Sequence, residues 1–169
     1  SSIKSDDQLE SGSELKICFS ENQVSFSLGQ TELVSRVING NYPDYKQIIP
    51  IKFPSSVVLS RDELLRAVKA SAIFAKAGVN DINLVLKSKE HRLVVSSASA
   101  QVGENSAEID GDFQGEDNEI IINYRYLIDG LNSLNGPRVE LKLINGQTPC
   151  LIKEENNKNH LYIVMPIRQ

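Results

Sequence analysis

The sequence predicts an α+β fold, in which antiparallel sheets form one side of a layered domain and two helices lie side by side on the other. The main observation is an internal repeat, because residues 57–169 contain the order strand, helix and three strands twice. Duplicated units of this kind tend to pack as two halves of one core. Aromatic residues make up only 6% of the chain and Trp is absent, so the core must consist mainly of Leu, Ile and Val.

Three strands are predicted ahead of the repeat. Apolar residues alternate with other residues over 15–20 and again over 24–28, which is typical of strands with one buried face. Glu21 and Asn22 separate these runs and indicate a hairpin, and residues 31–38 give a third strand. The following stretch, 39–56, contains three prolines and predicts an extended connection.

The first helix of the repeat has the clearest boundaries. Ser60 and Glu63 match a capping box at its start. Gly78 is predicted to stop the helix after Lys76. The hydrophobic staple and the apolar face are formed by Leu59, Leu64, Val68, Ala72 and Ala75.

The remaining elements follow the same order twice. Strands are predicted at about 82–87, 92–97 and 107–111. A strand at 119–122 then runs directly into a second helix, which begins at Asn123 and is stopped by Gly136. Further strands are predicted at 138–144, 149–153 and 161–165. Residues 14–38 match the three-strand end of another copy, so we interpret the chain as a fragment that begins partway through a domain.

Composition excludes several classes of protein. The 18 Lys and Arg residues face 22 Asp and Glu residues, a net charge of −4, so any basic surface for nucleic acid must be concentrated on one face. Cys18 and Cys150 lie far apart, which argues against a disulfide framework or a zinc site and favours the reducing cytoplasm. No secretory signal or membrane span is predicted.

No motif predicts catalysis, a metal or a cofactor. The sequence has no phosphate-binding loop, dinucleotide fingerprint, zinc-protease motif or nucleophile elbow. His91 and His160 have no partner at ligand spacing, and we expect them in or near turns. We interpret one acidic group as a solvated strand edge rather than a metal site, because its spacing differs from the calcium-loop pattern; it comprises Glu104, Glu108, Asp110, Asp112 and Glu116.

Three features each allow an ordinary and a functional interpretation. Arg66, Lys69 and Lys76 fall within about 80° on a helical wheel, either as a solvated face or as a surface turned towards phosphates. Ile73 and Phe74 project away from the apolar stripe, as a satellite of the core or as part of a subunit interface. The apolar C-terminal run 161–167 is either tied into the core or lines an adaptable groove.

Two segments resemble motifs of the bacterial DNA sliding clamps, the beta subunit of the replicative DNA polymerase III holoenzyme. Residues 40–50, Gly-Asn-Tyr-Pro-Asp-Tyr-Lys-Gln-Ile-Ile-Pro, are similar to the linker between the second and third domains of that family. Residues 162–168, Tyr-Ile-Val-Met-Pro-Ile-Arg, are similar to its C-terminus. The resemblance covers residues 14–169 and implies 14–48 as the end of the second clamp domain, 49–56 as a linker and 57–169 as the third domain, after a polar segment at 1–13.

The resemblance implies a non-catalytic processivity factor, associated with the nucleoid, that encircles duplex DNA without reading its sequence. Family members are head-to-tail homodimeric rings whose helices line the DNA channel and whose sheets form the outside. Basic helices within an acidic ring permit sliding through weak phosphate contacts. The positions that would face DNA are Arg61, Arg66, Lys69, Lys76 and Arg125.

The resemblance also implies a hydrophobic groove that binds short linear motifs of DNA polymerase subunits, the clamp loader and repair proteins. Apolar anchors of those motifs would supply most of the affinity. The matching groove positions are Pro43, Gln47, Ile48, Gln147, Pro149, Ile163, Met165, Pro166, Ile167 and Arg168. Gln47 replaces the Arg of many relatives and Gln169 replaces a usual apolar last residue, which affects the expected peptide preference.

The positions matching the dimer interface of the family are Ile73, Phe74, Glu104, Glu108 and Asp110. Because a first domain and half of a second are absent from this sequence, we expect that the chain by itself does not close a ring. The alternative interpretation is an α+β ligand-binding or enzymatic domain that shares only the order of elements. A clamp-like domain adapted as an inhibitor or resistance variant is a third.

Overall fold

The computed structural model describes residues 14–42, 44–157 and 159–168. The predicted polar segment 1–13, Pro43 and Gln169 therefore lie outside the described residues. The chain divides into two units, Ser1–Pro43 and Asp44–Gln169.

The described part of the first unit is an antiparallel three-stranded sheet. Its strands β1 (Lys16–Phe19), β2 (Gln23–Leu28) and β3 (Thr31–Arg36) pair in the order β1-β2-β3. The predicted hairpin between β1 and β2 is confirmed, with the Ser20 N–H donating to the Gln23 carbonyl at 2.8 Å. The register places Ile17, Phe26 and Leu33 in one row, and Ile17 and Leu33 are 45% and 60% exposed.

The second unit contains the predicted repeat, and its two copies exchange strands. The first copy is β4 (Ser55–Ser60), α1 (Arg61–Ala72), β5 (Asp81–Lys87), β6 (Arg92–Ser99) and β7 (Gly103–Asp110). The second is β9 (Asn118–Asn123), α2 (Tyr124–Asn132), β10 (Arg138–Leu143), β11 (Cys150–Glu154) and β12 (Leu161–Val164). The sheets have the orders β12-β11-β10-β4-β8 and β7-β6-β5-β9, so the leading strand of each copy pairs with the first of the three strands that follow the helix in the other copy.

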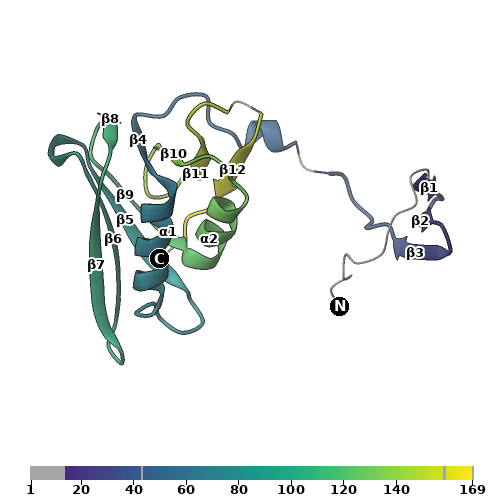
Figure 1. Cartoon of the computed structure of the whole chain (residues 1–169), viewed down its shortest axis with the longest axis horizontal. Helices are drawn as coiled ribbons and strands as arrows, with labels where there is room; N and C mark the ends of the chain where they lie inside the picture. The colour runs from purple at the N-terminus through teal and green to yellow at the C-terminus, as the bar shows by residue number, and fades with distance from the viewer. Residues whose placement is uncertain (1–13, 43, 158, 169) are drawn as a thin grey trace. The chain divides into compact units, whose positions relative to one another are not determined.

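Both helices begin directly after a strand, as predicted. The Ser60 hydroxyl accepts the Glu63 N–H at 3.4 Å, and the Asn123 side chain accepts the Arg125 N–H at 2.9 Å. These side chains satisfy free backbone donors at the helix starts. Figure 1 shows α1 and α2 side by side, and the two helices contact each other directly. The α+β layered fold is confirmed.

The core is formed almost entirely by Leu, Ile and Val, as the low aromatic content predicts. Alternate residues of the strands point inward, including Leu84 of β5 and Leu141 of β10, both with no exposed surface. Leu64 and Val68 of α1 and Leu127 and Leu131 of α2 pack into the same cluster. This single cluster joins both copies of the repeat, so neither copy has a core of its own.

Several predicted boundaries differ from the structure, and β7 begins at Gly103 and not at about 107. Helix α1 ends at Ala72 and not at Lys76. After it, the Phe74 N–H donates to the Ser71 carbonyl and the Ala75 N–H donates to the Ala72 carbonyl. These hydrogen bonds join residues three apart, which tightens the chain into turns. Strand β4 begins at Ser55, inside the predicted extended connection, and a short 3₁₀ helix, η1 (Tyr45–Gln47), precedes it. Strand β8 (Asp112–Gly115), which pairs with β4, was not predicted. A second 3₁₀ helix is η2 (Ser88–Glu90).

The two cysteines are expected to differ in reactivity. Cys150 is fully buried, and burial raises the pKa of its thiol to about 12, whereas Cys18 is exposed. Only the thiolate reacts with aromatic disulfide reagents. At pH 8 we expect Cys18 to react within minutes and Cys150 to react only when the second unit unfolds. A Cys18→Ser chain should show no rapid reaction, and rapid modification of Cys150 in that variant would contradict the packing described here.

Candidate functional site

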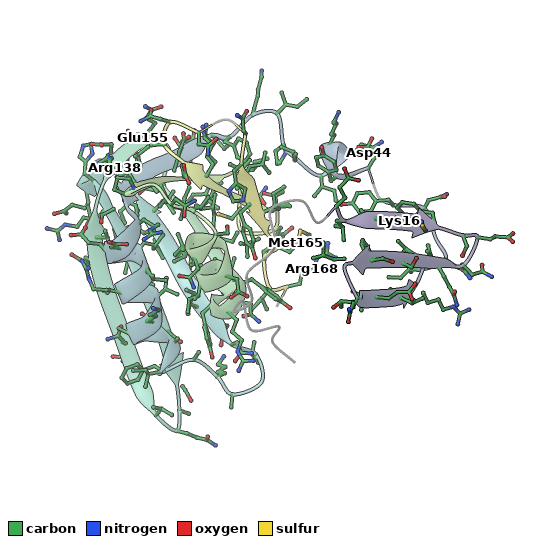
Figure 2. All side chains as sticks on the ribbon, turned by 45° about the vertical axis from the view of Figure 1, so that its right-hand side comes forward. Lys16, Asp44, Arg138, Glu155, Met165 and Arg168 are labelled. Atoms are coloured by element: carbon green, nitrogen blue, oxygen red, sulfur yellow. The ribbon has the colours of Figure 1, made fainter. Side chains whose placement is uncertain are left out.

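The C-terminal segment crosses from one sheet to the other. Strand β12 is the edge of the five-stranded sheet, and residues 165–168 continue from it (Figure 2). Pro166 forms a bridge with Ile122 of β9, the edge of the other sheet. The Ile167 N–H donates to the Ile121 carbonyl at 2.8 Å. The segment therefore lies along the edge of β9 and is held by backbone contacts, which leaves its side chains available for other contacts.

A largely apolar hollow, which we name the C-terminal hollow, lies between this segment and the start of α2. Its volume is about 400 Å³. Met165 is 56% exposed and Tyr126 is 58% exposed, so the hollow opens to solvent through large apolar side chains. The lining residues are Val79, Asn123, Tyr126, Tyr162, Ile163, Val164, Met165, Pro166 and Ile167.

Local sequence explains how two of these side chains are placed. Asn123 caps α2 and is therefore fixed at the start of that helix. Tyr162 lies against Gly130 of α2, where a Cβ atom would be only 2.5 Å from its ring. A glycine at this position lets the aromatic ring approach the helix backbone. Burial, and then the nearby Asp129 and Tyr126, raise the pKa of Tyr162, so its phenol stays neutral at physiological pH.

A second, more polar hollow lies on the other side of Ile167. Its volume is about 670 Å³, and it is lined by Glu119, Ile120, Ile121, Gly146, Gln147, Ile167 and Arg168. Gly146 brings the turn before β11 against β9, because a Cβ atom there would be 2.9 Å from the Glu119 carbonyl oxygen. Ile167 is thus shared by the two hollows, which together make one surface along the C-terminal segment.

The structure gathers six of the predicted groove residues on this surface. Ile163, Met165, Pro166 and Ile167 line the C-terminal hollow, and Gln147, Ile167 and Arg168 line the second one. Gln47, Ile48 and Pro149 are not among the lining residues of either hollow, and Pro43 lies outside the described residues.

Sequence reasoning missed five residues of the C-terminal hollow, Val79, Asn123, Tyr126, Tyr162 and Val164. Tyr126 carried a usable signal, because a Tyr on the polar side of a helix is a common contact residue. The other four become recognisable only when α2, β12 and the turn after α1 are placed side by side.

The basic residues predicted to face DNA differ in where they lie and in whether they are exposed. Arg66, Lys69 and Arg125 are exposed on the helices. Lys76 lies beyond the end of α1, so its predicted position on the helical wheel is wrong, because the chain has already left the helix; its N–H donates to the Asp81 side chain.

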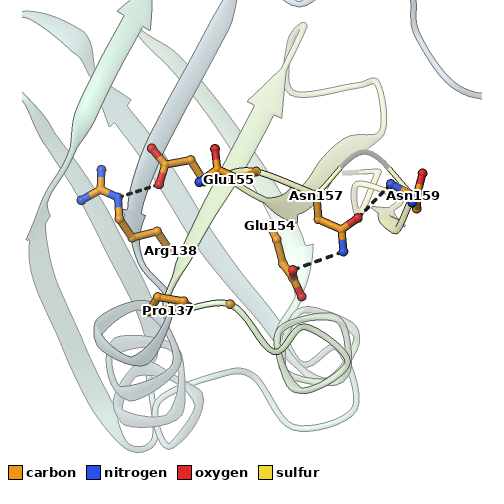
Figure 3. A pocket seen from close by; sticks show the side chains of 8 residues that line it. Pro137, Arg138, Glu154, Glu155, Asn157 and Asn159 are labelled. Carbon is orange, nitrogen blue, oxygen red and sulfur yellow. Dashed lines mark hydrogen bonds and ion pairs between the residues drawn. The ribbon is translucent and has the colours of Figure 1, made fainter.

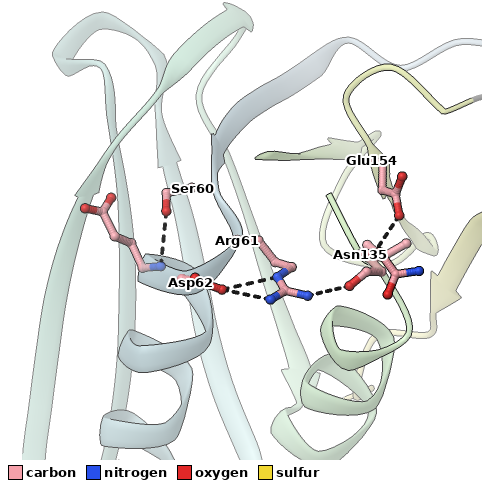
Figure 4. A network of polar contacts seen from close by, with 7 residues as sticks. Ser60, Arg61, Asp62, Asn135 and Glu154 are labelled. Atoms are coloured by element: carbon pink, nitrogen blue, oxygen red, sulfur yellow. Dashed lines mark hydrogen bonds and ion pairs between the residues drawn. The ribbon is translucent and has the colours of Figure 1, made fainter. Parts of the chain in front are cut away.

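Arg61 differs from the other basic residues because its guanidinium is engaged within the chain. Nη1 donates to the Leu134 carbonyl at the end of α2, and Nη2 lies 3.0 Å from the Asp62 carboxylate (Figure 4). The Asn135 N–H next to that carbonyl donates to Glu154 at 2.8 Å. Arg61 therefore links the start of α1 to the end of α2.

The residues predicted at a dimer interface lie together at one edge of the four-stranded sheet. Glu104, Glu108 and Asp110 are exposed on the edge strand β7. Ile73, 68% exposed, follows α1, and Gly103 at the start of β7 lies against the Phe74 ring. The Ser71 hydroxyl joins α1 to β7 through Asn105 at 3.0 Å. Arg92 pairs with Glu108 at 2.5 Å.

A further hollow near the end of α2 is lined by residues that form hydrogen bonds and an ion pair with one another. Arg138 lies 3.2 Å from Glu155, Asn157 donates to Glu154 at 3.2 Å, and Asn157 accepts from the Asn159 N–H at 2.9 Å (Figure 3). Hydrogen bonds from the Asn135 N–H and then from Asn157 hold the pKa of Glu154 below its usual value. These contacts fasten a loop and engage the side chains of Arg138, Glu154, Glu155 and Asn157.

Neither histidine belongs to a ligand cluster. His91 follows η2 with a φ of 54°, and His160 directly precedes β12, so both lie at turns as predicted. Among the residues that the structure describes, no three His, Cys, Asp or Glu side chains gather to hold a metal ion. In the same residues, no helix is both long and apolar enough to cross a membrane.

Comparison with known proteins gives a consistent result. Residues 46–168 match the family model described as DNA polymerase III beta subunit, C-terminal domain. A curated beta sliding clamp from Synechococcus elongatus is 32% identical over 148 residues, covering 88% of this chain and 40% of the relative. The chain thus spans about 40% of the length of the curated relatives it matches.

Solved structures agree with this match. The DNA polymerase III subunit beta from Pseudomonas aeruginosa has a TM-score of 0.84 at 26% identity, covering 95% of this chain and 44% of that one. The beta subunit from Thermotoga maritima has a TM-score of 0.79 at 30% identity, covering 92% and 42%.

Proposed function

Because the chain belongs to the family of the DNA polymerase III beta subunit, C-terminal domain, we propose that it is part of a ring-shaped sliding clamp that keeps polymerases on duplex DNA. In this role it is a non-catalytic processivity factor that acts on chromosomal DNA in the bacterial cytoplasm. The supporting observation is the apolar surface along the C-terminal segment, centred on Met165. The alternative of a ligand-binding domain that shares only the element order is set aside, because the family match covers residues 46–168.

The proposed partner site is the C-terminal hollow together with the polar hollow beside it. Large apolar side chains line the first, and transferring an apolar anchor into such a site supplies most of the binding energy. The partners proposed are short extended segments of polymerase subunits, the clamp loader and repair proteins. Pro43, Gln47, Ile48 and Pro149 are the remaining positions proposed for this partner site. The proposed division of the chain is a second domain ending at residue 48, a linker 49–56 and a third domain, residues 57–169.

The proposed DNA contact is weak and independent of sequence. Arg66, Lys69, Lys76 and Arg125 are exposed cations at or near the helices. Few phosphate contacts give low affinity, which suits a ring that slides. The proposed head-to-tail homodimer of the full-length protein uses Ile73 and Phe74 together with the acidic residues of β7, which would meet a basic surface of the partner.

An NMR titration with a short peptide of the Gln-Leu-x-Leu-Phe type tests the partner site. We expect saturable shift changes around Tyr126, Ile163, Met165 and Ile167. Met165→Ala should weaken binding about tenfold or more, because truncating a central apolar contact leaves part of the anchor exposed to water.

Val102→Ala is the matched control. Val102 is 54% exposed, close to the 56% of Met165, but it precedes β7 at the far edge of the other sheet. Equal affinities of the two variants, or shift changes that avoid the C-terminal segment, would contradict the proposed site.

A further inference from the structure

Three charged side chains form a compact group on the outer face of the five-stranded sheet, which we name the Lys–Glu–Lys triad. Glu140 and Lys142 belong to β10, and Lys153 belongs to β11. Lys142 Nζ lies 2.9 Å from Glu140 Oε1, and Lys153 Nζ lies 2.9 Å from Glu140 Oε2. The three side chains are only 16–28% exposed. One carboxylate thus faces two ammonium groups, and the triad carries one excess positive charge.

The triad keeps this charge at neutral pH. Burial by itself would raise the pKa of Glu140, but hydrogen bonds from Lys153 and Lys142 outweigh it and hold the pKa below its usual value. The carboxylate is therefore ionised. Arg138, two residues before Glu140 on β10, is held by Asp112 and Glu155, so the acidic excess of this sheet face lies at the opposite end of the strand.

The positive end of this face lies beside the proposed partner site. Lys142 is opposite Leu151 of β11, and Leu151 is opposite Ile163 of β12, which lines the C-terminal hollow. Opposite residues in antiparallel strands share a face, and two strand spacings place Lys142 roughly 10 Å from Ile163. Lys153 is one strand closer, opposite Leu161.

Apolar side chains lie next to one of the cations, Lys142, on this face. Leu151 is 6% exposed although it is not part of the main core cluster, as expected for a residue on the outward face. The ammonium of Lys142 lies 6.0 Å from the centre of the Phe53 ring. Partial removal from water strengthens the attraction between such a cation and an approaching carboxylate.

We propose that the Lys–Glu–Lys triad recognises an acidic side chain that flanks the apolar anchors of a bound partner peptide. This inference rests on the proposed function, and it adds a charge preference to a site that otherwise selects for apolar groups. If the triad only joins β10 to β11, it contributes to the stability of the sheet. In that case the charge of a peptide does not affect the affinity of the chain for it.

Two peptides with the same Leu and Phe anchors provide the test, one with Gln at every flanking position and one with Glu. Affinities for the whole chain are measured by fluorescence anisotropy. We expect the Glu peptide to bind about three- to fivefold more tightly at low salt, as for partly exposed ion pairs. The ratio should fall towards about one in roughly 0.5 M salt, because the ions screen the interaction.

Variants assign this preference to the triad. Lys142→Met and Lys153→Met each leave a neutral pair, and either should bring the two affinities together, whereas Glu140→Gln should enlarge the preference. Lys87→Met is the control, because Lys87 pairs with Glu90 at the other sheet and should leave the ratio unchanged. Using two separate lysines protects the test against one variant that folds poorly.

The possible outcomes separate the two proposals. Equal binding of the two peptides to the natural chain, or a preference that survives both lysine changes, would overturn the role of the triad and leave the partner site intact. Failure of both peptides to bind would overturn the proposed function and the inference together.

Discussion

Gly115→Ala is expected to destabilise the second unit by about 3 kcal/mol or more, or to prevent its folding. Gly115 ends β8 with a φ of 90°, and a Cβ atom there would lie 1.7 Å from the Pro54 carbonyl oxygen. That neighbour is backbone and cannot rotate away. It also accepts the Glu116 N–H and directly precedes β4, so the substitution would separate β8 from the first strand of the repeat.

Gly78→Ala is the matched control for this prediction. Gly78 has a φ of 85°, but no atom lies within 4 Å of the Cβ position. The Gly78→Ala substitution should therefore lower the free energy of unfolding only by the backbone strain, roughly 1–2 kcal/mol. The free energy of unfolding of both variants is measured in urea, with exposure of the Cys150 thiol as the signal of unfolding. If the two lose the same stability, the close approach of Gly115 to Pro54 has no energetic importance.

Gly130→Val is expected to cost about 2 kcal/mol and to weaken peptide binding at the C-terminal hollow. A Cβ atom at Gly130 would be 2.5–3.1 Å from the Tyr162 ring, so the ring must move away from α2. Overpacking of this kind costs about 1–3 kcal/mol, and it exceeds the gain from replacing glycine within a helix. Because Tyr162 lines the hollow, its displacement changes the shape that an anchor meets.

Two further variants separate packing from helix propensity. Asn132→Val places the same side chain on the exposed face of α2, where a cost of only a few tenths of a kcal/mol is expected. Combining Gly130→Val with Tyr162→Ala removes the clashing ring, so the costs should be less than additive. Full additivity in urea unfolding would show that Gly130 and Tyr162 do not interact energetically.

The candidate site was predictable in part. The apolar run at 161–167 drew attention to Met165 and Ile167, and both line the C-terminal hollow. Val79 and Asn123 were not predictable in this role. Val79 follows Gly78, the predicted helix stop, and Asn123 is already explained as the cap of α2. Their contribution depends on the meeting of two sheet edges that are some forty residues or more apart in sequence.

The sequence by itself determined the local elements of this protein. Ser60 and Asn123 start the helices because their side chains accept backbone N–H groups within the next three residues. Alternating apolar residues determined which face of each strand is buried, since a strand has a period of two. Such interactions act over a few residues, so the sequence reveals them directly.

Only the tertiary structure decided how the two copies of the repeat combine. Strand β4 pairs with β10 and β9 pairs with β5, so each copy completes the sheet of the other. It also decided that α1 ends at Ala72, that Arg61 reaches the end of α2, and that the C-terminal segment lies against β9. The physical reason is that strand partners are selected by burial and register across the whole core, and no short stretch of sequence specifies them.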